Sequence, residues 1–285
     1  MSRPVRIAAA GDVHCSPATR EQTLEAFARL RGKADVLLLA GDLTTHGEAD
    51  QAEVLLEACA QLDMPVIAVL GNHDWHTDRG EELAEQLGAG GIRVLEREHL
   101  VLPIDGVEVG IAGLKGFVGG FAGSHLPDFG EPLLRRVYAE TSDDVAALDA
   151  SLKAVAHCPL RVVLLHYAPT SQTLAGEPEG IWTMLGSGRL AAPIAEHEPD
   201  LVLHGHAHAG AFEGRIEQVP VYNVSVPVLK QAFWVFELAG VRAPASAIQG
   251  PTATPTLAVE GLGQRLPVGG ATVLSQGKGP PLVGP

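Results

Sequence analysis

Five short polar segments each follow an apolar run, and this arrangement constrains the fold more than any other feature of the sequence. The apolar runs are RIAAA, VLLLA, VIAVL, VVLL and LVLH, and the polar segments at their ends are GDVH (11–14), GD (41–42), GNHD (71–74), His166 and GHAH (205–208). Short apolar runs bounded by glycine predict buried strands. Because ligands gather at the carboxyl ends of strands in α/β sheets, we expect these side chains to meet at one edge of a sheet.

The spacing of the first three segments supports this expectation. Asp42 follows Asp12 by 30 residues, and Asn72 follows Asp42 by the same interval. Thirty residues is about the length of one βα unit, so successive strand ends should each contribute a polar cluster. The glycine beside each cluster allows a sharp departure from the strand and a close approach of backbone to a site.

Hydrophobic periodicity predicts βα units in the first 75 residues and antiparallel strands later. Strands are expected at Val5–Ala10, Asp35–Ala40 and Pro65–Leu70, and amphipathic helices at Thr19–Leu30 and Ala49–Leu62. Beyond Gly91 the Asp105-Gly106 dipeptide predicts a hairpin between HLVLPI and VEVGIAGL. Helices are expected at 131–156 and 190–197, and RVVLLH, DLVLHGH, VPVYNVS and AFWVFEL are expected to supply the remaining strands.

Composition bounds the class of protein. A chain of 285 residues that is 46% hydrophobic can bury a large core, and its formal charge of -14 argues against a broad nucleic-acid or anionic-membrane surface. Three cysteines without paired spacing indicate reduced thiols. The first apolar run is too short for a signal peptide or a membrane span, so we expect a cytoplasmic protein with no membrane partner.

The last 45 residues differ from the rest. Residues 241–285 contain 15 Pro plus Gly, no aromatic residue and four charged residues, a composition that does not support a packed core. We therefore expect a domain at 1–240 and a disordered Pro/Gly-rich tail at 241–285.

The residue types in the five segments indicate a metal site. Carboxylates and neutral imidazoles suit manganese, iron or zinc, and the absence of a cysteine cluster argues against a structural zinc finger. A carboxylate can bridge two ions, and a two-metal site can hold the attacking and leaving oxygens of a phosphoryl displacement while it acidifies a bound water. A metal-bound hydroxide is then the expected nucleophile.

The ordered set D-x-H, GD, GNHD, H and GHxH resembles the calcineurin-like metallophosphoesterase superfamily over roughly residues 5 to 240. The resemblance implies an α/β fold of four layers, with two packed mixed β-sheets flanked by α-helices. It also implies hydrolysis of a phosphate ester, by a phosphomonoesterase or phosphodiesterase, on a small phosphorylated substrate. The implied ligands are Asp12, His14 and His208 for one ion, Asn72, His166 and His206 for the second, and Asp42 as the bridge.

By the same resemblance, His73 faces the substrate instead of a metal ion. It would donate a proton to the leaving oxygen or stabilise charge on the phosphoryl group, with Asp74 orienting its ring. No arginine pair of the protein-phosphatase kind stands beside GNHD, and the D-x-H opening also occurs in the cyclic-nucleotide phosphodiesterase-like branch. Monoesters and diesters therefore both stay open as substrates.

Several residues near the motifs have two interpretations. His204 is either a partner of the metal ligands or a buried structural histidine, and His46 and His76 either reach substrate or are solvated loop residues. Cys15 is expected to pack on the opposite face of its strand. The segment 113–130 is either an irregular connection or a lid whose phenylalanines stack on an aromatic group of the substrate, namely Phe117, Phe121 and Phe129.

Three other functions compete with phosphate ester hydrolysis. A non-catalytic scaffold with this fold should have lost ligands, yet every expected ligand type is present. An amide or lactam hydrolase usually carries a tight HxHxDH cluster, whereas here the carboxylates come early and GHAH comes late. A nuclease would require a basic groove, which the composition does not indicate.

Overall fold

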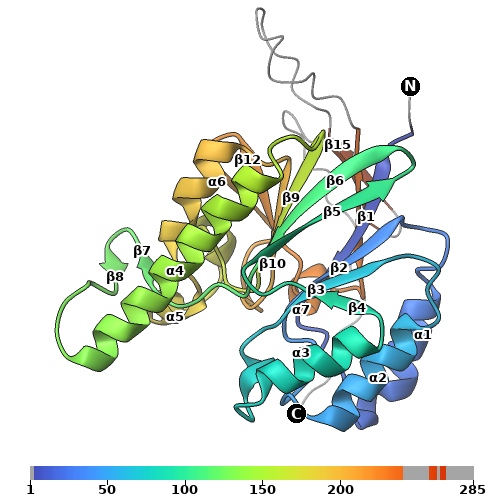
Figure 1. The fold of residues 1–285 in the computed structure, drawn as a ribbon, viewed down its shortest axis with the longest axis horizontal. Coiled ribbons are helices and arrows are strands. Elements are labelled where there is room, and N and C mark those ends of the chain that lie inside the picture. Colours follow the sequence, from blue (N-terminus) through green and yellow to red (C-terminus); the bar gives the residue numbers. More distant parts are fainter. Residues whose placement is uncertain (1–2, 240–256, 262–263, 268–285) are drawn as a thin grey trace, which may run out of the picture.

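Two β-sheets packed face to face form the centre of the structure, and helices cover both outer faces (Figure 1). The computed structural model describes residues 3–239, 257–261 and 264–267. The expected α/β fold of two mixed sheets flanked by helices is therefore confirmed.

The first sheet has seven strands in the order β15-β14-β13-β1-β2-β3-β4. The strands β1 to β4 are parallel to one another, and β13 runs antiparallel to β1. Three helices cover its outer face. In chain order these elements are β1 (Val5–Ala10), α1 (Arg20–Ala28), β2 (Val36–Ala40), α2 (Ala49–Cys59), β3 (Val66–Val69), α3 (Gly80–Ala89), β4 (Ile92–Val94), β13 (Trp234–Leu238), β14 (Leu257–Gly261) and β15 (Gln264–Pro267).

The second sheet has six strands in the order β11-β12-β10-β9-β6-β5, with antiparallel strands at its two edges. Helices α4 and α6 cover its outer face. The elements are β5 (Glu98–Ile104), β6 (Val107–Gly113), α4 (Pro132–Ala154), β9 (Leu160–Leu164), α6 (Ala191–His197), β10 (Leu201–His204), β11 (Glu213–Ile216) and β12 (Val219–Asn223). Outside the two sheets lie the hairpin of β7 (Gly120–Phe121) and β8 (Ser124–His125) and the short helices α5 (Trp182–Leu185) and α7 (Val226–Leu229).

The side chains of strand β1 alternate between two hydrophobic cores. Ile7 and Ala9 point into the core between the sheets, while Ala8 and Ala10 point into the core beneath α1 and α2. Because successive side chains of a strand point to opposite faces, a strand buried on both faces is apolar throughout. The continuous apolar run IAAA at positions 7–10 is the sequence feature that indicates this position.

The sequence located most elements but missed some. The predicted strand Val5–Ala10 has those bounds in the structure, and the hairpin through Asp105 and Gly106 joins β5 to β6 with a positive φ at both turn residues. Helix α3 and strand β4 were not predicted, because glycines at positions 80, 88, 90 and 91 interrupt the helical pattern of Leu83 and Leu87.

The division into a domain at 1–240 and a tail at 241–285 stays a prediction. Residues 240–256, 262–263 and 268–285 lie outside the described part of the chain. Within the predicted tail, β14 pairs antiparallel with β13, and β15 pairs with β14.

Asp35 joins the start of β2 to β1. Its carboxylate, 8% exposed, accepts hydrogen bonds from the backbone N–H of Arg6 at 2.8 Å and from the guanidinium groups of Arg3 and Arg6 at 3.0 and 2.8 Å. Burial alone would raise the pKa of Asp35, but the hydrogen bonds from Arg6 and Arg3 outweigh it and lower the pKa to about 2.

We predict that Asp35→Asn lowers the free energy of unfolding by about 1–2 kcal/mol at pH 7. Because the folded-state pKa lies below that of the unfolded chain, this contribution is present above about pH 4 and is lost as the pH falls towards 2. Urea denaturation of wild type and variant at pH 7 and pH 3 measures it. Asp63→Asn, at an exposed residue without a side-chain partner in the described chain, is the control, and a stability difference independent of pH would contradict the assignment.

Candidate metal centre

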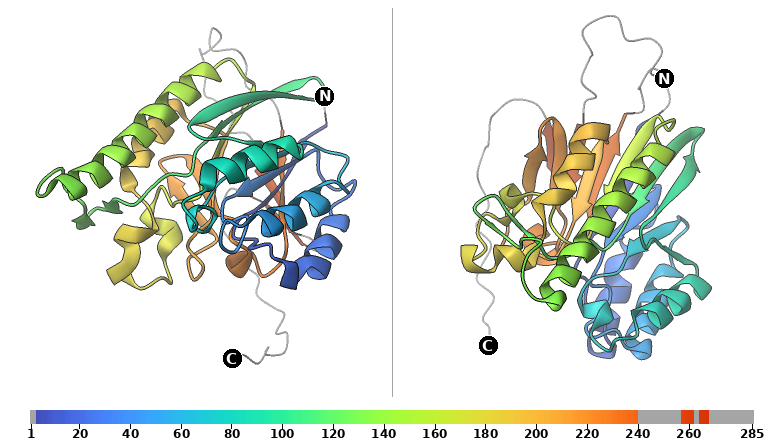
Figure 2. Two further views of the ribbon diagram at one scale, coloured as in Figure 1. Left: turned by 60° about the horizontal axis from the view of Figure 1, so that its bottom comes forward. Right: turned by 60° about the vertical axis from the view of Figure 1, so that its left-hand side comes forward.

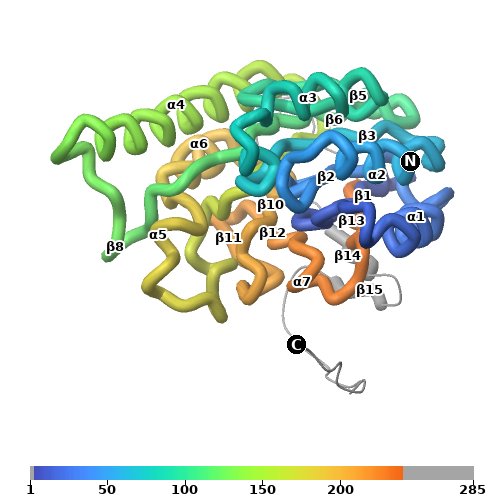
Figure 3. The backbone as a smooth tube through the Cα atoms, turned by 90° about the horizontal axis from the view of Figure 1, so that it is seen from below, coloured from blue at the N-terminus to red at the C-terminus, as the bar shows by residue number. Residues whose placement is uncertain are grey.

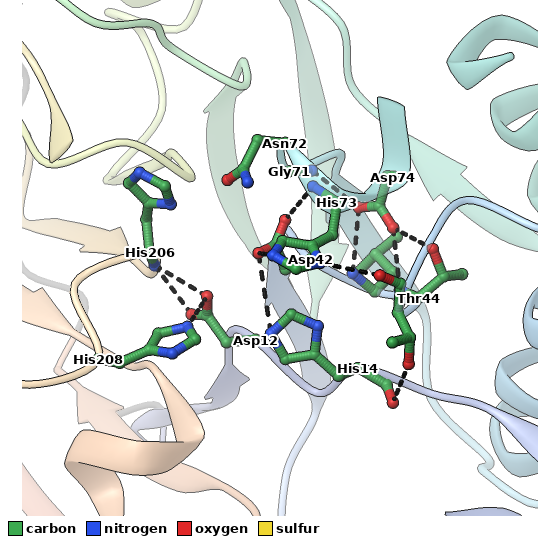
Figure 4. A network of polar contacts seen from close by, with 12 residues as sticks. Asp12, His14, Asp42, Thr44, Gly71, Asn72, His73, Asp74, His206 and His208 are labelled. Carbon is green, nitrogen blue, oxygen red and sulfur yellow. Dashed lines mark hydrogen bonds and ion pairs between the residues drawn. The ribbon is translucent and has the colours of Figure 1, made fainter. Parts of the chain in front are cut away.

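The ends of five strands bring the predicted donors to one edge of the two sheets (Figure 4). The first sheet supplies Asp12 and His14 after β1, Asp42 after β2, and Asn72 after β3. The second sheet supplies His166 after β9, and His206 and His208 after β10. The structure thus brings all seven predicted ligands together from segments up to 196 residues apart.

The donors form two groups that share one carboxylate. Ligand atoms of Asp12, His14, Asp42 and His208 lie within 4.8 Å of one another, and so do those of Asp42, His166 and His206. Asn72 joins the second group, because its Oδ1 lies 2.9 Å from Nε2 of His166. Asp42 is the member common to both groups, which is the position that a bridging ligand requires.

Four of the donors have a backbone conformation that non-glycine residues rarely adopt. Their φ angles are +57° at Asp12, +44° at His14, +49° at Asp42 and +69° at His206. Left-handed backbone at non-glycine residues costs free energy and persists where the surrounding structure enforces it, most often at functional sites. The strain here lies on residues that the sequence predicted to be metal ligands.

Glycines beside the donors leave room for the carboxylates. A Cβ at Gly71 would lie 2.1 Å from Oδ1 of Asp42, and one at Gly205 would lie 2.4 Å from Oδ2 of Asp12. Real Cβ atoms do not approach other atoms so closely, so any side chain at either position would displace a donor. Gly71 and Gly205 are therefore steric requirements of the site.

Hydrogen bonds to backbone carbonyls orient two of the imidazoles. Nδ1 of His166 donates to the carbonyl of Ala40 at 2.9 Å, and Nε2 of His206 donates to the carbonyl of Met184 at 3.2 Å. In a neutral ring, the other nitrogen then carries the lone pair. The lone pairs of Nε2 in His166 and Nδ1 in His206 are thus free for an ion.

Burial and hydrogen bonding shift the pKa values of three donors in the direction that metal binding requires, whereas the hydrogen bond with Asp12 raises the pKa of His208. Burial lowers the pKa of His206 to about 3 and also lowers that of His14, so both rings are neutral at neutral pH. Burial alone would raise the pKa of Asp12, but the hydrogen bond from His208 and the nearby His166 outweigh it and lower the pKa. Neutral imidazoles and an ionised carboxylate are the ligand forms of divalent metals.

The residues therefore fit metal ions. The donors of each group lie within 4.8 Å of one another, close to the spacing of ligands around one ion, and the mixture of carboxylate, amide and imidazole suits manganese, iron or zinc. A further trio on α4 and α6, Asp149, Glu196 and His197, lies outside this centre.

The position of His73 agrees with its expected place beside the donors, but Asp74 does not orient its ring. Nδ1 of His73 donates to the carbonyl of Thr45 at 2.8 Å, and Nε2 lies 3.9 Å from Oδ2 of Asp42. The fully buried carboxylate of Asp74 instead accepts hydrogen bonds from the backbone of Leu43, Thr44 and Gly71 and from the hydroxyl of Thr44 (Figure 4). Asp74 thus joins the loop after β2 to the loop after β3.

The structure shows the surroundings of the three histidines that had two interpretations. His204 is fully buried, and its ring contacts the carbonyl of Gly205 and the hydroxyl of Thr173, so it supports the loop that carries His206. His46 and His76 are exposed, with ring centroids 5.3 Å apart, and the His76 centroid lies 6.2 Å from that of His73. Cys15 is buried in the helix-covered core, and burial raises its pKa to about 12.

The three phenylalanines of the possible lid have separate positions. Phe121 is buried beside Trp182, Phe117 packs edge-to-face on Tyr167 with centroids 6.0 Å apart, and Phe129 is 79% exposed. Sequence reasoning missed Tyr167, whose ring centroid lies 4.4 Å from that of His206. Its position next to His166 in the chain was the available signal.

Comparison with known families agrees with this geometry. The sequence matches the family model of the calcineurin-like phosphoesterases over residues 5–210, which is more than half of the chain. The chain therefore belongs to the calcineurin-like phosphoesterase family. No curated protein matches the sequence.

Solved structures show the same fold. The phosphopantetheinyl hydrolase of Mycobacterium tuberculosis matches with a TM-score of 0.61 and 16% identity, over 79% of this chain and 90% of that chain. The anchor of the inner membrane complex of Plasmodium matches with a TM-score of 0.57 and 12% identity, over 90% of this chain and 84% of that chain. At these identities the likeness concerns the fold alone. In the described part of the chain, no helix has the length and apolar character to cross a membrane.

We predict that Gly71→Ala weakens Mn²⁺ binding by about tenfold or more and lowers the free energy of unfolding by about 1–3 kcal/mol, because the new Cβ displaces Asp42. Calorimetric titration of the metal-free protein with Mn²⁺ and urea denaturation measure the two effects.

Gly88→Ala is the matched control. A Cβ at Gly88 meets no atom within 4 Å and the residue lies in α3, so this variant should keep its metal affinity and gain about 0.4–1 kcal/mol of stability. Equal metal affinities of the two variants would contradict the steric argument.

Proposed function

We propose that this protein hydrolyses phosphate esters with two metal ions held at the shared edge of its sheets. The observation that carries the proposal is the sharing of Asp42 by two donor groups, one with Asp12, His14 and His208 and the other with His166 and His206. Membership of the calcineurin-like phosphoesterase family supports a hydrolase that acts on phosphate esters.

The proposed ligand assignment follows the two groups. Asp12, His14 and His208 hold the first ion, Asn72, His166 and His206 hold the second, and Asp42 bridges them. The bound ions would be manganese, iron or zinc, and their chemistry there would be to acidify a water and to stabilise the oxygens of a phosphoryl displacement.

In this proposal the protein supplies a proton and a fixed geometry. The ring of His73 is held by the carbonyl of Thr45, and its Nε2 points to the side of Asp42, where it can give a proton to the leaving oxygen or stabilise phosphoryl charge. Asp74 fixes the loops that carry Asp42 and His73, because it accepts hydrogen bonds from both. Its proposed role is therefore positional.

The scaffold alternative is less well supported. A protein that used this fold only to bind a partner would have no need to hold Asp12, His14, Asp42 and His206 in left-handed backbone conformations. The expected substrate is a small phosphorylated molecule, either a monoester or a diester. The three cysteines are unpaired and buried, which supports a reducing compartment such as the cytoplasm as the site of action.

We predict that Asp42→Asn lowers turnover on the order of 10³-fold while the fold stays intact, because the neutral amide cannot bridge two cations. Hydrolysis of p-nitrophenyl phosphate and of its bis ester by Mn²⁺-loaded protein measures turnover, and circular dichroism checks the fold. The same assays on wild type distinguish monoester from diester preference. Asp63→Asn is the control, and a variant as fast as wild type on either ester would exclude the bridging role.

For His73→Ala we predict retained metal and a rate reduced by about 10²-fold or more, as expected for loss of a general acid. Elemental analysis gives the metal content, and the same two esters give the rate. His76→Ala, a neighbouring exposed histidine that contacts the ring of His73, is the matched control and should have a much smaller effect. Loss of metal from His73→Ala would place His73 among the ligands.

A further inference from the structure

The large exposed apolar side chains of residues 3–239 gather in one region of the molecule. They are Phe129, Leu133, Leu134, Ile181 and Met184. The residues lie on the segment before α4, on the first turn of α4 and on or next to α5, and we call this set the apolar lobe. The β7–β8 hairpin lies against α5, because Thr183 contacts Ser124 by hydrogen bonds, and the chain runs from the hairpin to Phe129 and the start of α4. The start of α4 and the hairpin extend from the body of the molecule (Figure 2).

The exposure at α4 comes from an apolar stripe that continues beyond the body. Leu134 precedes the buried Thr141 by 7 residues and the buried Leu148 by 14, so all three lie on one face of the helix. Further along α4 this face packs on the second sheet. At the first turn the same face has no such cover, and Leu133 and Leu134 are exposed.

The part of the lobe at α5 also combines packed and exposed apolar side chains. Trp182 and Leu185 pack in a small core with Phe121, whereas Ile181 and Met184, three residues apart, are exposed. Met184 is 58% exposed, and within residues 3–239 the large apolar side chains outside the lobe are buried or only partly exposed. Large apolar side chains that are exposed near one another often mark a binding site.

The lobe adjoins the candidate metal centre. The carbonyl of Met184 accepts the hydrogen bond from Nε2 of His206, so α5 lies directly against a ligand of the second ion. On the same side, the ring of Tyr167 packs on that of His206, and Phe117 packs on Tyr167. A molecule with its phosphoryl group at the metal centre would therefore have α5 and its exposed Met184 beside it. Figure 3 shows the backbone continuing outward from α5 to β8 and on to the start of α4.

The charges beside the α4 part of the lobe are balanced, unlike those of the chain as a whole. Arg135 and Arg136 follow Leu134 directly, both are exposed, and neither guanidinium has an ion-pair partner in the described chain. Together with the exposed Asp128 and Glu131 they make this segment neutral, in a chain of net charge -14. A phosphorylated molecule meets less repulsion here than an evenly acidic surface would give.

From these observations we infer that the metal centre takes phosphate esters whose alcohol carries a long aliphatic chain, and that this chain lies on the apolar lobe. The inference rests on the proposed phosphate ester hydrolysis and names its substrate class. Four of the five lobe residues are aliphatic, which matches an alkyl chain better than a nucleobase. In the reaction, the P–O bond to the alcohol breaks, water supplies the new oxygen on phosphorus, and the alcohol leaves with a proton.

Binding of methylphosphonate and octylphosphonate to Mn²⁺-loaded protein tests the inference, because these probes are not hydrolysed and serve for monoesterase and diesterase alike. Calorimetry should show octylphosphonate binding about 10²-fold more tightly, since each buried methylene contributes roughly a factor of four and about half of the seven extra methylenes would be covered. Octylphosphonate is kept below its aggregation concentration.

The variant I181Q/L133Q/L134Q should lose about tenfold or more of this preference while its affinity for methylphosphonate stays unchanged. The variant I181L/L133M/L134M keeps the apolar surface at the same positions and should keep the preference. Equal affinities of the two phosphonates for wild type, or a preference that survives in the glutamine variant, would overturn the inference and leave the hydrolysis proposal standing. If neither phosphonate binds, the metal-centre proposal itself fails.

Sedimentation velocity without ligand tests a different occupant of the lobe. If wild type self-associates and the glutamine variant is monomeric, a second copy of the chain covers the lobe, and the assignment to substrate is overturned.

Discussion

The packing of two sheets face to face is the constraint on which the candidate site depends. One sheet supplies Asp12, His14, Asp42 and Asn72, and the other supplies His166, His206 and His208. The donors face each other only because the core between the sheets, built from residues such as Ile7, Leu38, Val162 and Leu203, fixes the distance between the strand ends. Hydrogen bonds across the junction, from the backbone of His206 to Asp12 and from His166 to Ala40, then set the positions of individual side chains.

The sequence predicted the elements whose signals are local. An apolar run such as VLLLA is buried on both faces of its sheet, and a glycine with a polar residue at its end indicates a strand that stops at a site. The five segments could therefore be assigned to one sheet edge, and the structure places their side chains together. The sequence alone could not show why Gly71 and Gly205 must be glycines. The reason is that a Cβ at either position would collide with the carboxylate of Asp42 or Asp12.

Features that depend on tertiary partners could not be predicted in this way. The ring of His73 is oriented by a backbone carbonyl, at Thr45, and a carbonyl carries no sequence signal. Asp74 was expected to orient that ring but joins two loops, because it lies beneath the backbone of Leu43 and Thr44. The exposure of Leu133 and Leu134 was also hidden, since their spacing on α4 is the same as that of its buried residues.

The hydrogen bond between Asp12 and His208 joins residues 196 positions apart in the chain. Contacts of such long range close a very large loop, so their entropic cost is met only after the intervening strands and helices have assembled. The rim of the site should accordingly order only after the strands of both sheets have formed, as should the pairing of β1 with β13, which spans even more of the chain. A substitution deep between the sheets, far from any donor, can therefore impair chemistry by loosening this late-forming junction.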